Sequence, residues 1–361
     1  MTAVKLYSCL EWHGKRGYMK ELYGVMKDGK EVSKYIIENA NGFRAEFLDM
    51  GAILDKLFVP DKDGNLVDVT LSNSSVEEYE ADGNFFGATV GPNANRIAKA
   101  EVVIDGVLYK MPVNDGENNL HTDVVNGVHR RIWDAKEEGN SVIFTINLPD
   151  GEFGLPGNRM MQVTYTVTDD NAIRIDYYAT SDKKTIYNMT NHTHFNLDGH
   201  ASGSVLDHVL WLNASCFTPV VAGAIPTGEI KNIKGTIFDF TTPKTIGPDI
   251  NTDDEQINLV SGYDHNYVID GADGTLKEVA WVKGPKSGRV MKVISDQPGI
   301  QLYTDNFVKD AKGKDGVVYG WRQGLCLETQ AYPDSIHQDS FPDVIYGPDR
   351  EYRTTTIYKF E

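Results

Sequence analysis

The sequence predicts an all-β protein of short antiparallel strands with few short helices. The first observation is period-two alternation, clearest at 163–168, where Val163, Tyr165 and Val167 share one face and three threonines the other. The second is the series of Gly and Asp turns between short strand-like runs. The third is that no segment sustains a helical 3.6-residue period over many turns. So many strands avoid exposed edges only in a barrel or a large sandwich.

The individual strands can be placed along the chain. The Asx-rich run 169–171 predicts a turn that joins 163–168 to 172–178 as a hairpin. Alternation and β-branched content predict further strands at 102–104, 108–109, 141–148, 289–294, 301–303 and 353–360. Segment 74–79 predicts a capped helix of one or two turns, and the polar run 249–258 predicts a mobile loop.

Composition sets the broad class. The chain has 361 residues with 40% hydrophobic content, enough for a large core without disulfides or metal. It shows no repeat or linker, so 1–361 is predicted to be a single domain. A formal charge of -17 opposes binding to nucleic acid and to acidic membranes. The expected partner is a neutral small molecule such as a sugar, or a protein.

The cysteines and the first residues bear on location. Cys9, Cys216 and Cys326 are widely spaced and form no C-x-x-C pair, which favours free thiols in a reducing cytoplasm. No apolar run approaches the length of a membrane span, and the N-terminus lacks the pattern of a signal peptide. We therefore expect a cytoplasmic, unexported protein. The first twenty residues, which include Trp12, are expected to form an added flap.

A histidine pair stands out in segment 191–197. If this segment is extended, His192 and His194 project from one face while Thr193 points away. Such a pair could transfer protons, could provide half of a metal site, or could be purely structural. A metal needs a third ligand at a definite spacing, and no second His or Cys cluster appears, so no metal is predicted.

A single carboxylate stands out in segment 324–330. Glu328 follows Leu325 and Leu327, which alternate with Cys326 in an apolar, strand-like frame. Burial there would raise the pKa of Glu328 toward a value useful for a general base. The alternative is a solvated position on the strand, which is the commoner fate of a glutamate.

Three further polar residues lie where loops meet predicted strands. Arg96 follows a loop, His121 follows a Gly-containing turn, and Asp264 is flanked by aromatic residues that could stack against a sugar ring. Each of them alone is more commonly a turn or surface residue.

Taken together, these segments resemble the aldose 1-epimerase (galactose mutarotase) family from about Gly24 to Glu361. The matching stretches occur in order along the chain: Gly51-Ala52, Val59-Pro60-Asp61, Asn95-Arg96-Ile97, Leu120-His121, Gly151 to Asn158, Asn191-His192-Thr193, Phe195-Asn196-Leu197, Tyr263-Asp264-His265-Asn266 and Leu327-Glu328-Thr329-Gln330.

The resemblance implies a fold, an activity and a site. The fold would be a large antiparallel β-sandwich, or supersandwich, and the activity would interconvert the α and β anomers of an aldohexose such as galactose or glucose without a cofactor. Glu328 would be the general base and His192 the general acid. The substrate would be bound by Asn95, Arg96, His121 and Asp264. His194 occupies a place usually held by Tyr, and we assign it no catalytic role.

The chain also departs from the family pattern. Thr122-Asp123 replace a usual Gly-Gly after Leu-His, and His337 stands where Asn is common, so the pocket rim is expected to differ. The segment 1–23 has no family counterpart and is predicted to be an N-terminal extension. The resemblance leaves open which aldose is preferred and whether the protein is a monomer or a homodimer.

Two other functions fit the same residues. A noncatalytic sugar sensor or carbohydrate-binding protein would use the polar groups and aromatics without turnover. A glycoside hydrolase would use Glu328 and Asp264 as paired carboxylates at a defined separation. Measured carboxylate separation and release of reducing sugar would distinguish them.

Overall fold

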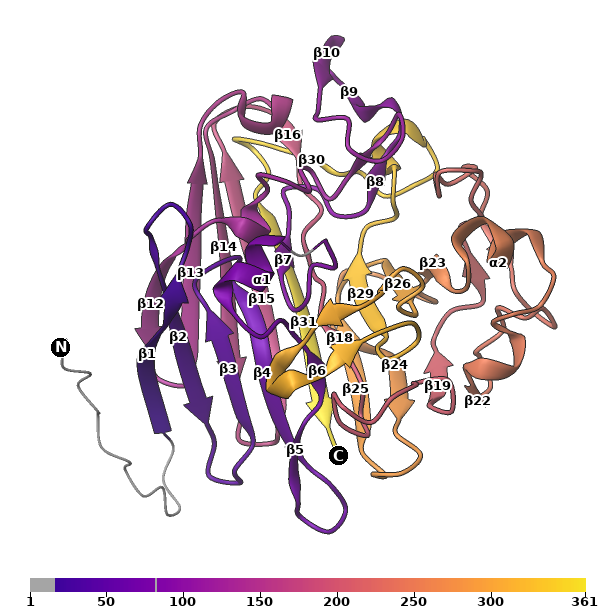
Figure 1. Ribbon diagram of the computed structural model, residues 1–361. Coiled ribbons are helices and arrows are strands. Elements are labelled where there is room, and N and C mark those ends of the chain that lie inside the picture. The colour runs from indigo at the N-terminus through magenta and orange to yellow at the C-terminus, as the bar shows by residue number, and fades with distance from the viewer. Residues whose placement is uncertain (1–16, 82) are drawn as a thin grey trace.

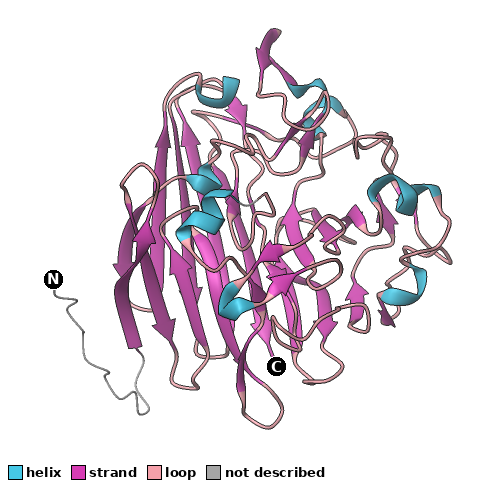
Figure 2. Ribbon diagram, viewed as in Figure 1, coloured by secondary structure: helices cyan, strands magenta, loops and turns pink. Residues whose placement is uncertain are grey.

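The computed structural model describes residues 17–81 and 83–361, which are built mainly from antiparallel strands (Figures 1 and 2). The all-β prediction is confirmed. Among the described residues the α-helices are α1 (Val76–Ala81) and α2 (Glu255–Val260). Single 3-10 turns occur at Ala98–Ala100, Val128–Arg130, Glu152–Gly154, Gly247–Asp249, Lys314–Gly316 and Ser335–His337.

Three sheets form the body of the molecule. The first contains five strands in chain order: β1 (Gly17–Val25), β2 (Glu31–Glu38), β3 (Arg44–Leu48), β4 (Ile53–Pro60) and β5 (Leu66–Asp68). The second has nine strands in the order β12 (Asp134–Glu138), β13 (Ser141–Leu148), β14 (Arg159–Val167), β15 (Ala172–Ser181), β31 (Tyr352–Phe360), β25 (Val290–Ser295), β24 (Lys277–Lys283), β19 (Val209–Leu212) and β22 (Lys244–Thr245). The third has five, in the order β21 (Lys231–Asn232), β20 (Cys216–Phe217), β23 (Asp264–Val268), β26 (Gly299–Tyr303) and β29 (Cys326–Gln330).

Short strand pairs connect and cover these sheets. They are β6 (Thr70–Leu71) with β18 (His194–Phe195), β7 (Thr89–Val90) with β17 (Thr190–Asn191), β8 (Arg96–Ile97) with β11 (Asn119–Leu120), β9 (Glu101–Ile104) with β10 (Val107–Lys110), β16 (Thr185–Ile186) with β30 (Ile345–Tyr346), and β27 (Ala311–Lys312) with β28 (Val318–Tyr319).

The nine-stranded sheet is the common wall against which both five-stranded sheets pack (Figure 1). On one half, Tyr35 of β2 contacts Phe144 of β13 edge-on at 5.6 Å between ring centroids. On the other half, the Tyr358 hydroxyl of β31 donates to the carbonyl of Leu327 in β29 at 2.9 Å. A single cluster of buried apolar side chains runs through both halves, so the site on β29 rests on a continuous core.

The predicted hairpin is present, with β14 paired to β15 from Arg159↔Ser181 to Val167↔Ile173. The other strands expected from alternation coincide with observed strands, although the predicted strand 289–294 begins one residue before β25. The predicted loop at 249–258 is wrong in its second half, where α2 begins. Asp254 caps this helix by accepting from the Gln256 N–H at 2.8 Å, and Ile257 and Val260 are buried one turn apart.

The N-terminal region divides at residue 17. Residues 17–23 of the predicted extension lie in β1, which pairs with β2 from Gly17↔Glu38 to Val25↔Glu31. The remainder, 1–16 with Trp12, lies outside the described residues.

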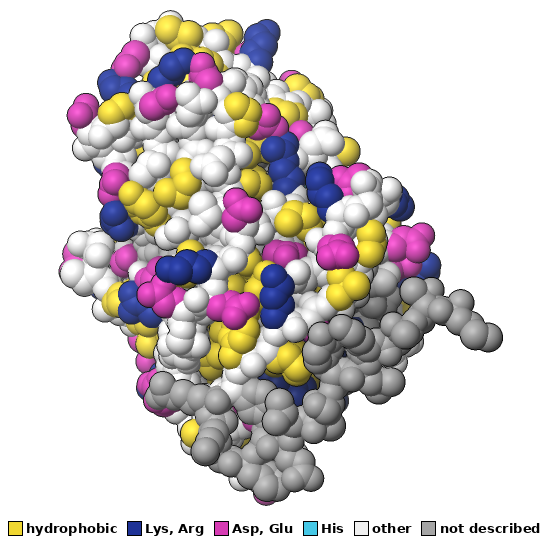
Figure 3. Space-filling view, turned by 90° about the vertical axis from the view of Figure 1, so that its left-hand side faces the viewer, with side chains coloured by type: hydrophobic (Ala, Val, Ile, Leu, Met, Phe, Trp, Pro, Cys, Tyr) yellow, Lys and Arg dark blue, Asp and Glu magenta, His cyan; other side chains and the backbone are white. Residues whose placement is uncertain are grey.

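Figure 3 shows the side of the molecule that is on the left of Figure 1, where acidic and basic side chains are interspersed. Charged side chains of both signs are typical of a solvated surface, and at the edge of a sheet they oppose pairing with another chain. Within 17–81 and 83–361, no helix has both the length and the apolar character needed to cross a bilayer.

Candidate active site

A pocket of about 340 Å³ opens above the third sheet. All six residues predicted to form the site line it, although they come from segments far apart in the sequence. Its lining residues are Gly83, Asn84, Phe85, Asn95, Arg96, Asp115, Leu120, His121, His192, Asp264, Tyr303, Phe307 and Glu328. The volume lies at the small end of the range for pockets that bind small molecules.

The register of β23, β26 and β29 places the acidic side chains. Asp264 pairs with Tyr303 across β23 and β26, and Gln301 pairs with Glu328 across β26 and β29. Gln301 lies between the two carboxylates and donates its side-chain N–H to Asp264 Oδ1 at 2.7 Å. Because side chains alternate along a strand, Cys326 and Glu328 point to the pocket side of β29 while Leu327 points to the core.

Glu328 faces His192 across the pocket. Glu328 Oε1 lies 3.8 Å from His192 Nε2, and the two side chains are 3% and 9% exposed. No described residue donates a hydrogen bond to Glu328 Oε2, so this buried oxygen is free to accept a proton or a hydrogen bond from a ligand.

Burial favours the neutral form of both groups. It raises the pKa of the Glu328 carboxyl well above its ordinary value; the charge of Asp264 adds to this rise, and the charge of Arg96 opposes it. Burial lowers the pKa of His192 well below its ordinary value, and positive charge on His194 or His121 lowers it further. The raised pKa moves Glu328 toward the working pH of a general base, whereas the lowered pKa leaves the His192 ring neutral, so His192 can act as an acid only through the N–H of that neutral ring.

The second side of the pocket is a strained loop. Asn95 and His121 both have left-handed backbone angles, with φ of 58° and 51°. The Asn95 backbone N–H donates to His121 Nδ1 at 3.1 Å. Burial, followed by the charge of Arg96, lowers the pKa of His121 well below its ordinary value, so this ring is neutral and carries its proton on Nε2.

Arg96 links this loop to the sheet. Its Nε donates to Asp115 Oδ2 at 2.8 Å, and its Nη1 lies 3.7 Å from Asp264 Oδ2. The guanidinium is therefore held at the pocket wall with donors directed toward two carboxylates. This arrangement fixes a set of donors and acceptors suited to several hydroxyl groups.

Aromatic residues that the sequence reasoning missed form the pocket rim. Phe307 is 58% exposed, and its ring stacks on Tyr303 with a centroid separation of 6.4 Å. Phe85 lies against the His121 ring at 4.8 Å and is held in a left-handed conformation. No local signal in the sequence marks these residues, because their positions depend on how distant loops meet.

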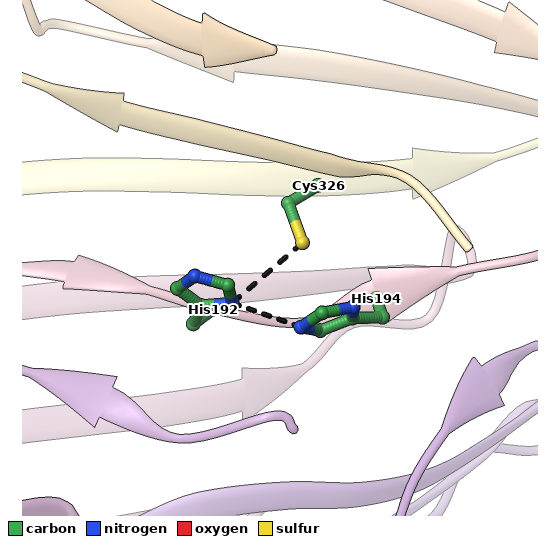
Figure 4. A group of neighbouring side chains, drawn as sticks. All are labelled: His192, His194 and Cys326. Carbon is green, nitrogen blue, oxygen red and sulfur yellow. Dashed lines mark hydrogen bonds between the residues drawn. The ribbon is translucent and has the colours of Figure 1, made fainter. Parts of the chain in front are cut away.

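Beneath the pocket lies a group that could suggest a metal site (Figure 4). The ligand atoms of His192, His194 and Cys326 all lie within 4.8 Å of one another. However, His194 Nε2 is 3.0 Å from the carbonyl oxygen of Asn84, which only accepts hydrogen bonds. Burial raises the pKa of the Cys326 thiol well above its ordinary value. Metal ligands must be deprotonated, so this group is better described as a hydrogen-bonded cluster.

Thr122, Asp123 and His337, which depart from the family pattern, do not line the pocket. The Thr122 hydroxyl donates to the Asn93 carbonyl at 2.9 Å, and Asp123 accepts from the Val125 and Asn126 N–H groups. His337 Nδ1 lies 2.6 Å from Asp334 Oδ1. These residues stabilise the loops that carry the site.

The fold and the site together define a β-sandwich protein with a small polar pocket in which a buried carboxylate faces a histidine. Comparison with known proteins assigns this class more closely. The family model described as aldose 1-epimerase matches residues 33–359.

The galactose mutarotases of Bos taurus and Homo sapiens are each 38% identical to this chain, over 91% and 92% of it and 94% and 95% of their own lengths. The aldose 1-epimerase of Escherichia coli is 34% identical over 95% of this chain and 99% of its own. A solved aldose epimerase homologue from C. elegans superposes with a TM-score of 0.83 at 32% identity, covering 96% of this chain and 99% of its own.

The chain therefore belongs to the aldose 1-epimerase family. Its activity is that of an epimerase acting on a sugar, and its supersandwich fold is that of the family.

Proposed function

We propose that the protein interconverts the α and β anomers of an aldohexose, with Glu328 as general base and His192 as general acid. The observation that carries this assignment is the 3.8 Å approach of His192 Nε2 to Glu328 Oε1 inside a pocket lined by sugar-binding types of residue. Galactose is the first candidate substrate because several relatives are galactose mutarotases. Glucose, its C4 epimer, is the second.

The reaction requires two coordinated proton transfers. Glu328 takes the proton of the anomeric hydroxyl while His192 gives a proton to the ring oxygen, and the bond between the anomeric carbon and the ring oxygen breaks. The aldehyde end rotates, and the same steps run in reverse to close the ring on its other face. Each transfer assisted in this way is typically worth about 10²–10⁴ in rate.

The remaining polar residues hold the sugar. Arg96 and Asp264 offer a donor and an acceptor to adjacent hydroxyls, and His121 offers its Nε2 proton to the ring or its substituents, with Asn95 beside it. Phe307 offers an exposed ring for stacking on an apolar face of the sugar. Holding the open chain near its closing geometry lowers the entropic cost of ring closure.

Polarimetry of freshly dissolved α-galactose and α-glucose tests the function directly. Enzyme should speed the approach to the equilibrium rotation above the spontaneous rate, and the two sugars should be ranked by kcat/KM. Binding of either sugar without acceleration would contradict the proposal and would support a sugar sensor. Release of new reducing ends from a glycoside would instead support a hydrolase.

Asp264→Asn is expected to raise KM about tenfold, which corresponds to the loss of about one charge-assisted hydrogen bond to the sugar. It should also move the acid limb of the kcat/KM profile to lower pH. The reason is that the charge of Asp264 raises the pKa of Glu328, so its removal lets Glu328 ionise at lower pH. Steady-state kinetics across pH check both effects, and an unchanged KM would remove Asp264 from sugar binding.

We also propose a cytoplasmic location and a monomeric or homodimeric state. The described cysteines, Cys216 and Cys326, are free thiols, which supports a reducing compartment. Fractionation of cells and light scattering of the purified protein test these two statements separately.

A further inference from the structure

We propose that His194, together with Asp305, holds the proton that replaces the one His192 gives to the sugar, and keeps the His192 ring in the tautomer that can give it. His194 does not line the pocket and acts through His192, so it is a positioning residue. The proposal rests on the assignment of His192 as the general acid.

The partners of His194 decide where its protons are. Its Nδ1 lies 2.6 Å from Asp305 Oδ1, and both side chains are 0% exposed. Its Nε2 lies 3.0 Å from the Asn84 carbonyl oxygen and 3.0 Å from His192 Nδ1. A carbonyl only accepts, so Nε2 carries a hydrogen. This holds whether the proton shared with Asp305 sits nearer Nδ1 or nearer Oδ1.

The surrounding backbone is shaped to fit this pair. Asp305 has a left-handed φ of 49°, which costs energy for a residue with a side chain. Gly324 packs against both partners: a Cβ there would lie 2.6 Å from Asp305 Oδ2 and 3.1 Å from His194 Cβ. The pair is therefore held in a closely packed, buried space next to His192.

The consequence for His192 is a fixed tautomer. His192 Nδ1 faces His194 Nε2 and, at 3.6 Å, the Cys326 sulfur (Figure 4). Because His194 presents an N–H to this nitrogen, Nδ1 accepts. The proton of the neutral His192 ring therefore sits on Nε2, which lies 3.8 Å from Glu328 Oε1. His121 is fixed in the same way, but its Nδ1 accepts from a backbone N–H. A backbone N–H can only orient a ring, whereas an imidazole can also release its proton.

A buried, neutral histidine can act as an acid only if it receives a second proton as it gives up its own. A neutral imidazole that gives up its only proton becomes an imidazolate, which is too basic to form near neutral pH. In the proposed step His192 Nε2–H breaks as the ring oxygen takes that proton, and the electron pair of the anomeric carbon–oxygen bond stays on the ring oxygen. At the same time His194 Nε2–H breaks and its proton bonds to His192 Nδ1.

The charges balance across this step. His192 begins and ends neutral, with its proton moved from Nε2 to Nδ1. His194 ends neutral with its remaining proton on Nδ1, bonded to the Asp305 carboxylate. Glu328 becomes neutral as it takes the anomeric proton, so one negative charge has in effect moved from Glu328 to Asp305. Ring closure reverses every transfer.

The tautomers can be observed in the wild-type enzyme. Protein labelled with ¹⁵N in histidine should show His192 with a bare Nδ1 and a protonated Nε2, and His194 with a protonated Nε2, in two-bond ¹H–¹⁵N correlation spectra near pH 7. Spectra of the His192→Asn and His194→Gln variants assign the signals. A protonated Nδ1 on His192, or a bare Nε2 on His194, would overturn the proposal without any need for an active variant.

Kinetics test the proton supply. In His194→Gln the amide can still donate to His192 Nδ1 but cannot release a proton, so kcat is expected to fall about 10²-fold while KM stays within about threefold. In mixtures of H2O and D2O, a plot of kcat against the fraction of deuterium should be less curved for this variant than for wild type, because fewer protons move in the same step. His200→Gln is the matched control, since His200 is a buried histidine 3.4 Å from Asp315 Oδ2 and lies outside the pocket lining. It should retain the wild-type kcat and isotope effect.

The results distinguish a failure of the proton supply by His194 from a failure of the assignment of His192 as general acid. A His194→Gln enzyme with the wild-type kcat and isotope effect would exclude the proton supply, even if His192→Asn is inactive. Full activity of His192→Asn would instead remove the general acid itself.

Discussion

Glu328→Gln is expected to lower kcat for anomer interconversion about 10²–10⁴-fold while sugar binding stays measurable. Glutamine keeps the shape of the side chain and can still hydrogen-bond the anomeric hydroxyl, but it cannot accept its proton. Glu328 Oε2, which no described residue hydrogen-bonds, is the atom whose basicity is lost. Polarimetry after subtraction of the spontaneous rate measures kcat, and calorimetric titration with galactose measures binding.

Stability provides an independent readout for the same variant. The pKa of Glu328 is raised in the folded state, so the free energy of unfolding falls as pH rises from the ordinary glutamate pKa to this raised value, where the loss is complete. Above that pH Glu328→Gln should therefore melt at a higher temperature than wild type, and near pH 4 the two should melt alike. Glu46→Gln, which alters a buried glutamate ion-paired to Lys34 outside the pocket, should keep the wild-type kcat. A Glu328→Gln enzyme with wild-type turnover would exclude Glu328 as the base.

Sequence reasoning identified the strands whose two faces have different environments. In β14 the buried and half-buried positions alternate from Arg159 to Val167, so period two was visible in the residue types themselves. Helix α2 was missed because the polar residues around Asp254 suggested a loop, whereas Asp254 itself is the helix cap. The signal was present in the spacing of Ile257 and Val260.

For the site too, residues in short local motifs could be predicted from the sequence, whereas contacts between distant segments could not. The six predicted residues lie in motifs that can be identified from short stretches of sequence, and the fold brings all six to one pocket. The partnership of His194 with Asp305 joins residues 111 positions apart, and it depends on a left-handed backbone at Asp305. The histidine pair was expected on one extended face, but β17 ends at Asn191 and β18 begins at His194. The two imidazole rings are nevertheless in contact, with His192 Nδ1 3.0 Å from His194 Nε2.

His192→Asn is expected to lower kcat about 10²–10⁴-fold, because asparagine can donate a hydrogen bond to the ring oxygen but cannot release a proton to it. The matched control is His208→Asn. His208 is a buried histidine whose pKa is lowered to about 4, and it accepts a hydrogen bond from the Leu197 N–H outside the pocket lining. This control should keep the wild-type kcat even if it melts at a lower temperature.

The double variant Glu328→Gln, His192→Asn tests whether the base and the acid transfer their protons in the same step or in separate steps. If the base and the acid transfer their protons in one ring-opening step, removing either group abolishes that step, and the double variant should be only slightly slower than the slower single variant. Two losses that multiply would contradict a concerted pair and would indicate that each group acts in its own step. The proton held by His194 and Asp305 is then of use only while His192 remains, so adding His194→Gln to His192→Asn should cost no further activity.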